Sequence, residues 1–358
     1  MKKINKILLV IQRSNGDVFL SVSLINSLYN FYKSPDIDLL VNDDTYQVAK
    51  LLPNINNIYK FSYTLKKDFR LKQEKNIIKS IFKKYDLSIS LTASDRSVIY
   101  ALLGGKISIC AIERDNRKSW WKKLLLTHYY YFDSFQQILI NNLQPLKILN
   151  IDHDNIQQSI NFSQNDHVNI SKKFKLKDIG SFIIFHPSAQ YEYKIYPKKH
   201  RDKLLKLLSS LGVSIIVTGG NSEIDLKIKN EIPSISNVHN FIGKTSIQDY
   251  FLLSQLSLAY IGMDTLNMHV AASQSKRIFA IFGPTKLSLW SPWSNSVKMS
   301  TSIDIPVQTY GENTIFQADM KCVACGKKGC ENTNFSKCLD NIDPTIVFEE
   351  VRNWYKNA

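Results

Sequence analysis

The feature that most constrains the fold of this chain is a regular alternation of short apolar runs with longer segments of helical periodicity. The first run, residues 6–11, is apolar from Ile7 onward, as expected of a strand buried on both faces. It leads through a turn at Gly16 and Asp17 into an apolar-periodic segment at 18–31. Strands that alternate with helices in this way form parallel, doubly wound sheets. The sequence therefore predicts an α/β fold.

The alternation continues through both halves of the chain. In the first half, strands are predicted at 37–41, 57–61, 87–91 and 107–112, and helices at 45–52, 68–84, 96–103 and 133–151. In the second half, strands are predicted at 182–185, 214–217, 256–261 and 277–282, with helices at 197–211, 222–231, 246–253, 267–272 and 344–355. The polar, basic segment 161–178 has no strong periodicity and is interpreted as the link.

These elements predict two facing Rossmann-like domains, residues 1–165 and 166–358, with a cleft between the carboxyl ends of their strands. Ligands bind at that edge in such sheets. A length of 358 residues agrees with two domains of about 100–200 residues each. The segment before Gln12 is too short for a signal peptide, and no run reaches the roughly 18 apolar residues of a membrane span. We therefore expect a cytoplasmic protein.

The formal charge of +15 favours an anionic partner, which could be nucleic acid, an acidic membrane or a phosphorylated substrate. No helix-turn-helix, RNP-like or zinc-finger spacing supports nucleic acid, so we expect no nucleic-acid partner. No Gly-x-Gly-x-x-Gly follows a predicted strand, which argues against a dinucleotide-dependent oxidoreductase.

Polar residues follow the predicted strands at the positions where ligands bind. Asp17 lies in the first strand-to-helix turn, where it can serve as a general base or merely cap the helix. Lys194 lies in the loop after strand 182–185, where its charge can hold a diphosphate, or it is a solvated surface lysine. Gly220 allows a ligand close to the backbone or only makes a turn. Glu223 can hold a ribose hydroxyl or only favour the helix dipole.

A third strand end adds further polar residues before the predicted helix at 267–272. Asp264, Thr265 and His269 flank Leu266 there, and His269 is either a ligand contact or a satisfied buried histidine. Three strand ends of one parallel sheet therefore point to one site.

Four of the five cysteines fall within one short segment, 322–338. Their spacing is Cys322-x2-Cys325-x4-Cys330-x7-Cys338. Such density in a cytosolic protein favours a metal over disulfides, with zinc ahead of iron and reduced, unligated thiols as the alternative.

Two basic stretches carry apolar or aromatic residues. Residues 61–85 can form a basic amphipathic helix that lies on an anionic membrane. Lys118, Trp120, Trp121 and Lys122 suit a membrane interface or a lipid-linked acceptor. For each stretch the alternative is a solvated basic helix and an aromatic core segment.

Taken in order, these motifs resemble glycosyltransferase family 9, the bacterial ADP-heptose:lipopolysaccharide heptosyltransferases, over nearly the whole chain. The matching marks are Gly16-Asp17 with Leu20, His186-Pro187 with Lys194 ahead of Tyr196-Pro197, Thr218-Gly219-Gly220, Asp264-Thr265 with His269 and Ala271-Ala272, and Gly283-Pro284-Thr285 leading to Trp290. The resemblance implies the GT-B fold.

The resemblance also implies an activity, which is inverting transfer of a heptose-like sugar from a nucleotide-diphosphate sugar to a lipopolysaccharide core or another glycan or protein hydroxyl. The implied donor is ADP-heptose. Asp17 would be the base, and Lys194 would stabilise the leaving diphosphate without a catalytic metal. The implied donor-binding residues are Ser188, Ala189, Gly220, Glu223, Thr245, Asp264, Thr265, Leu266 and His269.

Relatives also carry cysteine knuckles, some of which bind metal, which agrees with a structural zinc or iron at Cys322, Cys325, Cys330 and Cys338. The implied acceptor is an anionic, lipid-linked molecule or a glycan. The implied location is the cytoplasm, with a peripheral position on the inner face of the bacterial inner membrane.

The sequence departs from the family pattern at two turns. Leu266 and Ser188 stand where the family usually has glycine after the Asp-Thr and His-Pro pairs. Glycine at a strand-to-helix turn permits positive φ or a close backbone approach, which leucine resists. The alternative function is therefore a noncatalytic or altered-donor GT-B scaffold stabilised by its metal knuckle.

Overall fold

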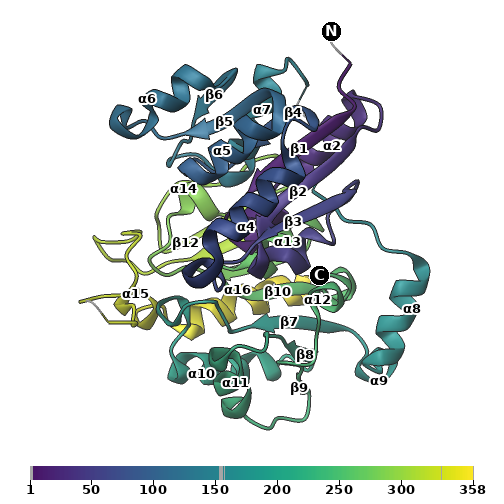
Figure 1. Ribbon diagram of the computed structural model, residues 1–358. Coiled ribbons are helices and arrows are strands. Elements are labelled where there is room, and N and C mark those ends of the chain that lie inside the picture. The colour runs from purple at the N-terminus through teal and green to yellow at the C-terminus, as the bar shows by residue number, and fades with distance from the viewer. Residues whose placement is uncertain (1–2, 153–155, 157, 332, 358) are drawn as a thin grey trace. The chain divides into compact units, whose positions relative to one another are not determined.

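The computed structural model describes residues 3–152, 156, 158–331 and 333–357, without the side chains of 66–69. It divides into two compact units, Met1–Ile160 and Asn161–Ala358, here called unit 1 and unit 2. Figure 1 shows the elements of both units along the chain. Each unit is built around one sheet and is described by itself.

Unit 1 holds six parallel strands in the spatial order β3-β2-β1-β4-β5-β6. Their bounds are β1 (Lys6–Ile11), β2 (Asp36–Asn42), β3 (Asn57–Phe61), β4 (Tyr85–Ser90), β5 (Gly105–Ile112) and β6 (His128–Tyr131). β1 is buried from its second residue onward, as its apolar run predicts. The strand order reverses between β1 and β4, which is the point where ligands bind in doubly wound sheets.

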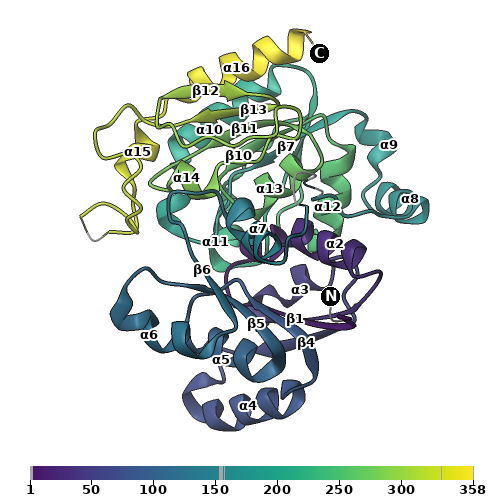
Figure 2. The same cartoon turned by 90° about the horizontal axis from the view of Figure 1, so that it is seen from above.

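Helices cover both faces of this sheet. They are α1 (Asn15–Phe19), α2 (Val22–Phe31), η1 (Asp43–Thr45), α3 (Tyr46–Ala49), α4 (Lys66–Ile81), α5 (Asp95–Gly104), α6 (Asn116–Leu125) and α7 (Ile138–Ile148). α4 and α5 pack on one face, and α2 and α7 contact each other on the other (Figure 2). The helix predicted at 18–31 is interrupted at Leu20 and Ser21, which separate α1 from α2.

Unit 2 holds seven strands in the order β12-β13-β11-β10-β7-β8-β9. Their bounds are β7 (Phe182–His186), β8 (Ser214–Val217), β9 (Val238–Asn240), β10 (Ala259–Met263), β11 (Arg277–Ile281), β12 (Val307–Tyr310) and β13 (Asn313–Phe316). All neighbours pair parallel except β12, which pairs antiparallel with β13 at the edge. The order again reverses at the centre, between β7 and β10.

The helices of unit 2 are α8 (Gln164–Lys173), α9 (Leu176–Ile179), η2 (Glu192–Lys194), α10 (Lys198–Ser209), α11 (Glu223–Glu231), α12 (Ile247–Leu256), α13 (Leu266–Ser273), α14 (Leu287–Trp290), α15 (Lys337–Asp340) and α16 (Pro344–Asn357). α10 and α16 bury leucine, valine and phenylalanine side chains in the core on one face of the sheet, and α12 and α13 pack together (Figure 2).

Three sequence predictions need correction. The segment 161–178 is not an irregular link, because α8 and α9 lie in it and belong to unit 2. The strand predicted at 256–261 begins only at Ala259, since α12 continues to Leu256. Strands β6, β9, β12 and β13 were not predicted. The predicted fold class, two doubly wound α/β domains with parallel sheets, is confirmed. Among the described helices, none has the length and apolar character needed to cross a membrane.

Candidate functional site

The central feature of unit 2 is an ion pair at its strand-order reversal. The loop after β7 carries Lys194, and Asp264 directly follows β10. The Lys194 Nζ lies 2.9 Å from the Asp264 Oδ2 and donates a hydrogen bond to it. Asp264 is 7% exposed and Lys194 is 25% exposed, so the pair lies at the rim of the core. The two residues predicted separately from strand ends are therefore in direct contact.

The electrostatics of this pair keep the lysine charged. Burial lowers the pKa of Lys194, but the charge and hydrogen bond of Asp264 outweigh burial, and the net pKa is raised above the usual value. An ammonium group has three N–H donors, and Asp264 accepts one of them. Lys194 can therefore present positive charge to an anionic ligand while Asp264 fixes its direction.

His269 of α13 lies in the same electrostatic neighbourhood. Burial lowers the pKa of His269 to about 4, a shift that Asp264 opposes and Lys194 assists. Its ring is therefore neutral at pH 7. Among the described residues, the buried Nδ1 has no hydrogen-bond partner, and a buried polar atom of this kind calls for one. A ligand hydroxyl is one group that would supply this partner, and ligand contact was one of the two interpretations of His269.

Thr265 and Leu266 form the start of α13. The Thr265 hydroxyl accepts a hydrogen bond from the backbone N–H of Asn267, and the helix begins at Leu266. Neither Leu266 nor Ser188 has positive φ. The non-glycine side chains at these two turns therefore cost no left-handed backbone strain in this chain.

His186 is a further buried residue at this edge. Its Nδ1 lies 2.9 Å from the Thr218 Oγ1 and accepts from the Asn267 Nδ2 at 3.1 Å, which leaves the proton of the neutral ring on Nε2. Burial lowers the pKa of His186 to about 4. Gly262 pairs with His186 across the sheet, and a Cβ there would stand 2.3 Å from the His186 carbonyl oxygen. The histidine thus ties three strand ends together.

Ser188 and Ala189 are both buried, and the Ser188 hydroxyl is already engaged. It donates to the Asp225 Oδ1 at 2.5 Å, and Asp225 also accepts from the backbone and hydroxyl of Ser222. Burial raises the pKa of Asp225, but these hydrogen bonds outweigh it and leave the pKa below its usual range. Ser188 therefore fixes the turn at the start of α11.

Gly220 and Thr245 lie on neighbouring turns. A Cβ at Gly220 would lie 3.0 Å from the Asp225 carboxylate, so glycine leaves room for that carboxylate beside the backbone. The backbone N–H of Gly243 donates to the Gly219 carbonyl at 3.1 Å and holds the two turns together. Thr245 is half-buried, and Glu223 is exposed at the first position of α11.

Sequence reasoning assigned no role to three residues of this edge: Asp225, Thr218 and Asn267. Asp225 could have been found from the spacing Ser222-x-x-Asp225, which is a capping-box pattern. Thr218 directly follows β8 and Asn267 opens α13, so both also occupy strand-to-helix turns.

In unit 1, Asp17 lies after β1 at the corresponding reversal point. It is 3% exposed and forms a capping box with Ser14, whose backbone N–H and hydroxyl both donate to the Asp17 Oδ2. The Arg13 Nε lies 2.9 Å from the Asp17 Oδ1. Asp17 therefore does cap α1, which was one of the two interpretations, and its second oxygen faces an arginine.

Around Asp17, the strand ends hold buried polar atoms that sequence reasoning missed. Among the described residues, the Gln12 Nε2, the Asn15 Oδ1 and the Asn42 Oδ1 are buried without hydrogen-bond partners. The Gln12 Oε1 accepts from the Ser97 hydroxyl at 2.8 Å, so its amide is held in place. The signal was available, because Gln12 directly follows β1, Asn15 opens α1 and Asn42 ends β2. Such unsatisfied groups are typical of a site that a polar ligand completes.

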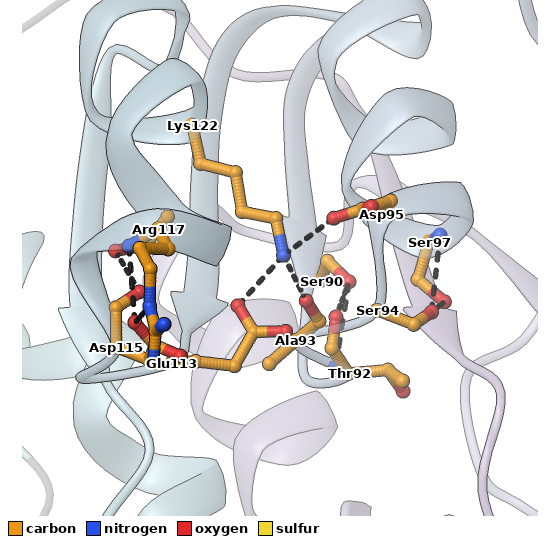
Figure 3. A network of polar contacts seen from close by, with 11 residues as sticks. Ser90, Thr92, Ala93, Ser94, Asp95, Ser97, Glu113, Asp115, Arg117 and Lys122 are labelled. Atoms are coloured by element: carbon orange, nitrogen blue, oxygen red, sulfur yellow. Dashed lines mark hydrogen bonds and ion pairs between the residues drawn. The ribbon is translucent and has the colours of Figure 1, made fainter.

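The basic stretch of α6 is only partly exposed. Lys118 and Trp120 face solvent, and Trp121 packs against the core. Lys122 is fully buried, and its Nζ donates to the Ala93 carbonyl at 2.6 Å and to Glu113 at 2.7 Å, and pairs with Asp95 at 2.9 Å. Figure 3 shows this ammonium between the three groups. Lys122 is therefore not available to an acceptor or a membrane, which corrects that prediction.

We expect Lys122→Met to lower the free energy of unfolding by about 1–3 kcal/mol. Methionine keeps the buried volume, but Ala93 loses a donor and Glu113 loses its cation. The carboxylates of Glu113 and Asp95 are partly exposed, so water limits the loss of stability. Urea unfolding measures the change. Lys123→Met is the control, since the hydrogen bond of Lys123 within the described residues goes to the exposed Asn116 side chain. A loss of stability as large in that variant would contradict the buried network.

The four clustered cysteines do not form a metal site as this structure places them. Cys322 and Cys325 are exposed, Cys330 is half-buried and Cys338 is buried in α15. Within the described ranges, which omit residue 332, no group of three or more His, Cys, Asp or Glu side chains is arranged to hold a metal ion. Burial, with a smaller effect of the neighbouring thiols, raises the pKa of Cys338 to about 11.

A structural metal at these cysteines stays a prediction. Because the spacing lets four thiolates converge within one segment, protein purified without added metal is expected to carry about one equivalent of zinc or iron. Cys322→Ser should lose it, and Cys110→Ala, which changes the buried cysteine of β5, should keep it. Elemental analysis gives the answer. Less than about a tenth of an equivalent, with all five thiols titrating, would rule the metal out.

Comparisons with known proteins agree on one family. The sequence model of "Glycosyltransferase family 9 (heptosyltransferase)" matches residues 75–318. Lipopolysaccharide heptosyltransferase 3 of Escherichia coli is 24% identical over 292 residues, which cover 80% of this chain and 85% of that protein. The structure of the glycosyl transferase family 9 protein from Veillonella parvula DSM 2008 matches with a TM-score of 0.76 at 16% identity, covering 99% of this chain and 98% of that one. The E. coli ADP-heptose lps heptosyltransferase II matches with a TM-score of 0.70 at 18% identity, covering 98% and 99%.

Proposed function

Because the chain belongs to glycosyltransferase family 9 and is a glycosyltransferase, we propose that it transfers a heptose-like sugar from ADP-heptose to a hydroxyl of a lipopolysaccharide core. The observation that carries the proposal is the Lys194–Asp264 pair at the strand-order reversal of unit 2. It offers a fixed, partly exposed positive charge at the edge where doubly wound sheets bind their ligands.

The donor diphosphate would lie against this pair. Lys194 supplies a charge that the diphosphate meets on binding and meets more strongly as it departs, so the step requires no divalent cation. The N-terminus of α13, capped by Thr265, adds backbone N–H groups and a favourable dipole end. Asp264 orients Lys194 and accepts from a sugar hydroxyl, and the unpartnered Nδ1 of neutral His269 serves the sugar as well.

The remaining donor contacts are assigned by position. We assign Gly220 and Ala189, which lie in turns after β8 and β7, to close approach of the donor, and add Leu266 at the start of α13. We assign Glu223 and Thr245 to the nucleoside end, because both lie on the outer turns joined by the Gly243–Gly219 hydrogen bond. Ser188 acts through Asp225 on the shape of the turn.

Asp17 is proposed as the base, with the acceptor held by the unsatisfied amides of Gln12, Asn15 and Asn42. In one displacement, the acceptor oxygen bonds the anomeric carbon while the bond from that carbon to the diphosphate oxygen breaks. The hydroxyl proton passes to the Asp17 carboxylate, the electron pair leaves with the diphosphate, and the anomeric configuration inverts.

The alternative, a noncatalytic or altered-donor scaffold, rested on Leu266 and Ser188. Neither has the positive φ that would require glycine, so leucine and serine cost no left-handed backbone strain at these turns. Turnover of a nucleotide sugar separates the two functions.

The test uses the whole chain with ADP-, GDP- and UDP-sugars. An ADP-sugar is expected to raise the Tm by mass action, since ligand at about 100 times its Kd adds roughly 2.7 kcal/mol, and to release ADP when a heptose-deficient lipopolysaccharide core is added. A Tm shift with a GDP- or UDP-sugar instead would assign the donor to that nucleotide. No shift and no release with the whole panel would overturn the proposal.

A further inference from the structure

One side of unit 1 exposes large apolar side chains that the proposed reaction does not use. Trp120 of α6 is 59% exposed, Leu124 is 76% exposed and Leu125 is 55% exposed. Tyr129 and Tyr131 of the edge strand β6 and Phe135 after it are also exposed. We call these six residues the α6–β6 surface.

The exposure follows from the helix geometry. Ser119 and Lys122 face inward on α6, and Trp121 packs against the core of unit 1. Trp120 and Leu124 are four residues apart and therefore share the outward face. Because the inner face is already filled by Lys122 and its partners, these side chains have no place in the core of unit 1.

Cations lie beside this apolar surface. Residues 113–133 contain five Lys or Arg and three acids, Glu113, Asp115 and Asp133. Lys122 is buried and pairs with Glu113. Arg117 is 93% exposed and lies 3.6 Å from Asp115, Arg114 is 71% exposed and lies 3.8 Å from Asp133, and Lys118 is exposed. The Lys123 Nζ lies 5.4 Å from the centre of the Tyr131 ring, so a cation and an aromatic ring stand side by side.

This surface is continuous with the turn that carries Asp17. Phe132 directly follows β6, and the Arg13 guanidinium carbon lies 4.7 Å from the centre of its ring. Arg13 in turn pairs with Asp17. A chain of contacts through Phe132 and Arg13 therefore links the α6–β6 surface to the proposed base.

We propose that the α6–β6 surface docks unit 1 on an anionic lipid membrane. Tryptophan and tyrosine favour the interface between headgroups and acyl chains, leucine and phenylalanine enter the acyl region, and exposed Arg and Lys contact lipid phosphates. Charge complementarity selects this occupant, because exposed cations lie beside the apolar side chains and the whole chain carries a formal charge of +15. Docking brings the chain to the plane in which a lipid-linked acceptor lies, and this consequence rests on the proposed function.

Flotation of the whole chain with phospholipid vesicles tests the docking without donor or acceptor, so a failed transferase assay leaves the result intact. The chain is expected to float with vesicles of phosphatidylcholine and phosphatidylglycerol, to bind phosphatidylcholine alone at least about tenfold more weakly, and to be released by salt. Trp120→Ala and Leu124→Ser should each weaken binding about tenfold with an unchanged Tm, since both side chains are exposed. Lys118→Gln should weaken it about fivefold.

Leu71→Ser on α4 is the matched control, because Leu71 is 82% exposed and lies on the other basic helix of unit 1. It should float as the unchanged chain does. Absence of flotation, flotation unaffected by Trp120→Ala and Leu124→Ser, or an equal loss in Leu71→Ser would overturn the proposal. Self-association that Leu124→Ser abolishes, without flotation, would assign the surface to a second copy instead.

Discussion

Asp17→Asn is expected to lower kcat for sugar transfer by about 10²–10⁴-fold while the affinity for the donor changes little. The amide has nearly the shape of the carboxylate and can still accept from the Ser14 hydroxyl and backbone, but it cannot take a proton from the acceptor. Donor affinity is spared because the donor contacts are assigned to unit 2. Rates of ADP release and the Kd of an ADP-sugar, measured on the same preparation, separate the two effects.

The control for Asp17→Asn has to lose the same structural contacts. Asp249 is buried, completes a capping box with Ser246 and pairs with Lys173 at 2.6 Å, as Asp17 does with Ser14 and Arg13. Both Asn variants should lose about 1 kcal/mol of stability from the weakened cap and ion pair. Only Asp17→Asn should lose transfer. Equal rates in the two variants would leave Asp17 as a helix cap and no more.

Much of the fold could be predicted from the sequence because parallel strands at the centre of a sheet are apolar on both faces. β1, β7 and β8 each consist of a run of Ile, Leu, Val or Phe with one polar residue at an end. The missed strands lie away from the centre of their sheets: β9, a half-buried three-residue strand, β6 and β12 at edges, and β13 beside β12. Their short or mixed patterns carry less periodic signal than a central strand.

The longer helix in the expected link, α8, could have been predicted from its cap. Ser163 and Asp166 form a capping box at the start of α8, the same Ser-x-x-Asp spacing as at α11 and α12. The weak apolar periodicity of 161–178 was the wrong criterion. Only Ile170 of α8 is buried, so that helix has little apolar stripe to detect.

The candidate site shows the same division between local and long-range information. Lys194 and Asp264 could each be named from a strand end, but their contact joins residues far apart in sequence and depends on β7 and β10 being neighbours. Lys122 was misplaced for a local reason. Its basic neighbours suggest a solvated stretch, whereas the spacing of Ser119, Lys122 and Leu126, all buried, marks the inner face of the helix.

Lys194→Ala is expected to weaken binding of an ADP-sugar about tenfold and to lower kcat by about 10²–10³-fold. The ammonium meets the diphosphate in the bound state and more strongly as charge develops on the leaving group, so both constants change and kcat changes more. Its pKa is raised by Asp264, so the lysine stays charged across neutral and mildly alkaline pH and its loss should not reshape the pH profile there. Steady-state rates and donor titration at several pH values measure this.

Removal of Lys194 also leaves the buried Asp264 carboxylate without its cation, so a loss of activity could come from a distorted turn. The double variant Lys194→Ala/Asp264→Asn separates the two causes, because it removes the unpaired charge along with the lysine. Stability should return toward that of the unchanged chain, while kcat should stay low, since no ammonium stabilises the leaving diphosphate. Lys198→Ala, at an exposed lysine that begins α10 and pairs with Asp202, should keep full activity. Recovery of turnover in the double variant would show that Lys194 only neutralises Asp264 and does not act on the donor.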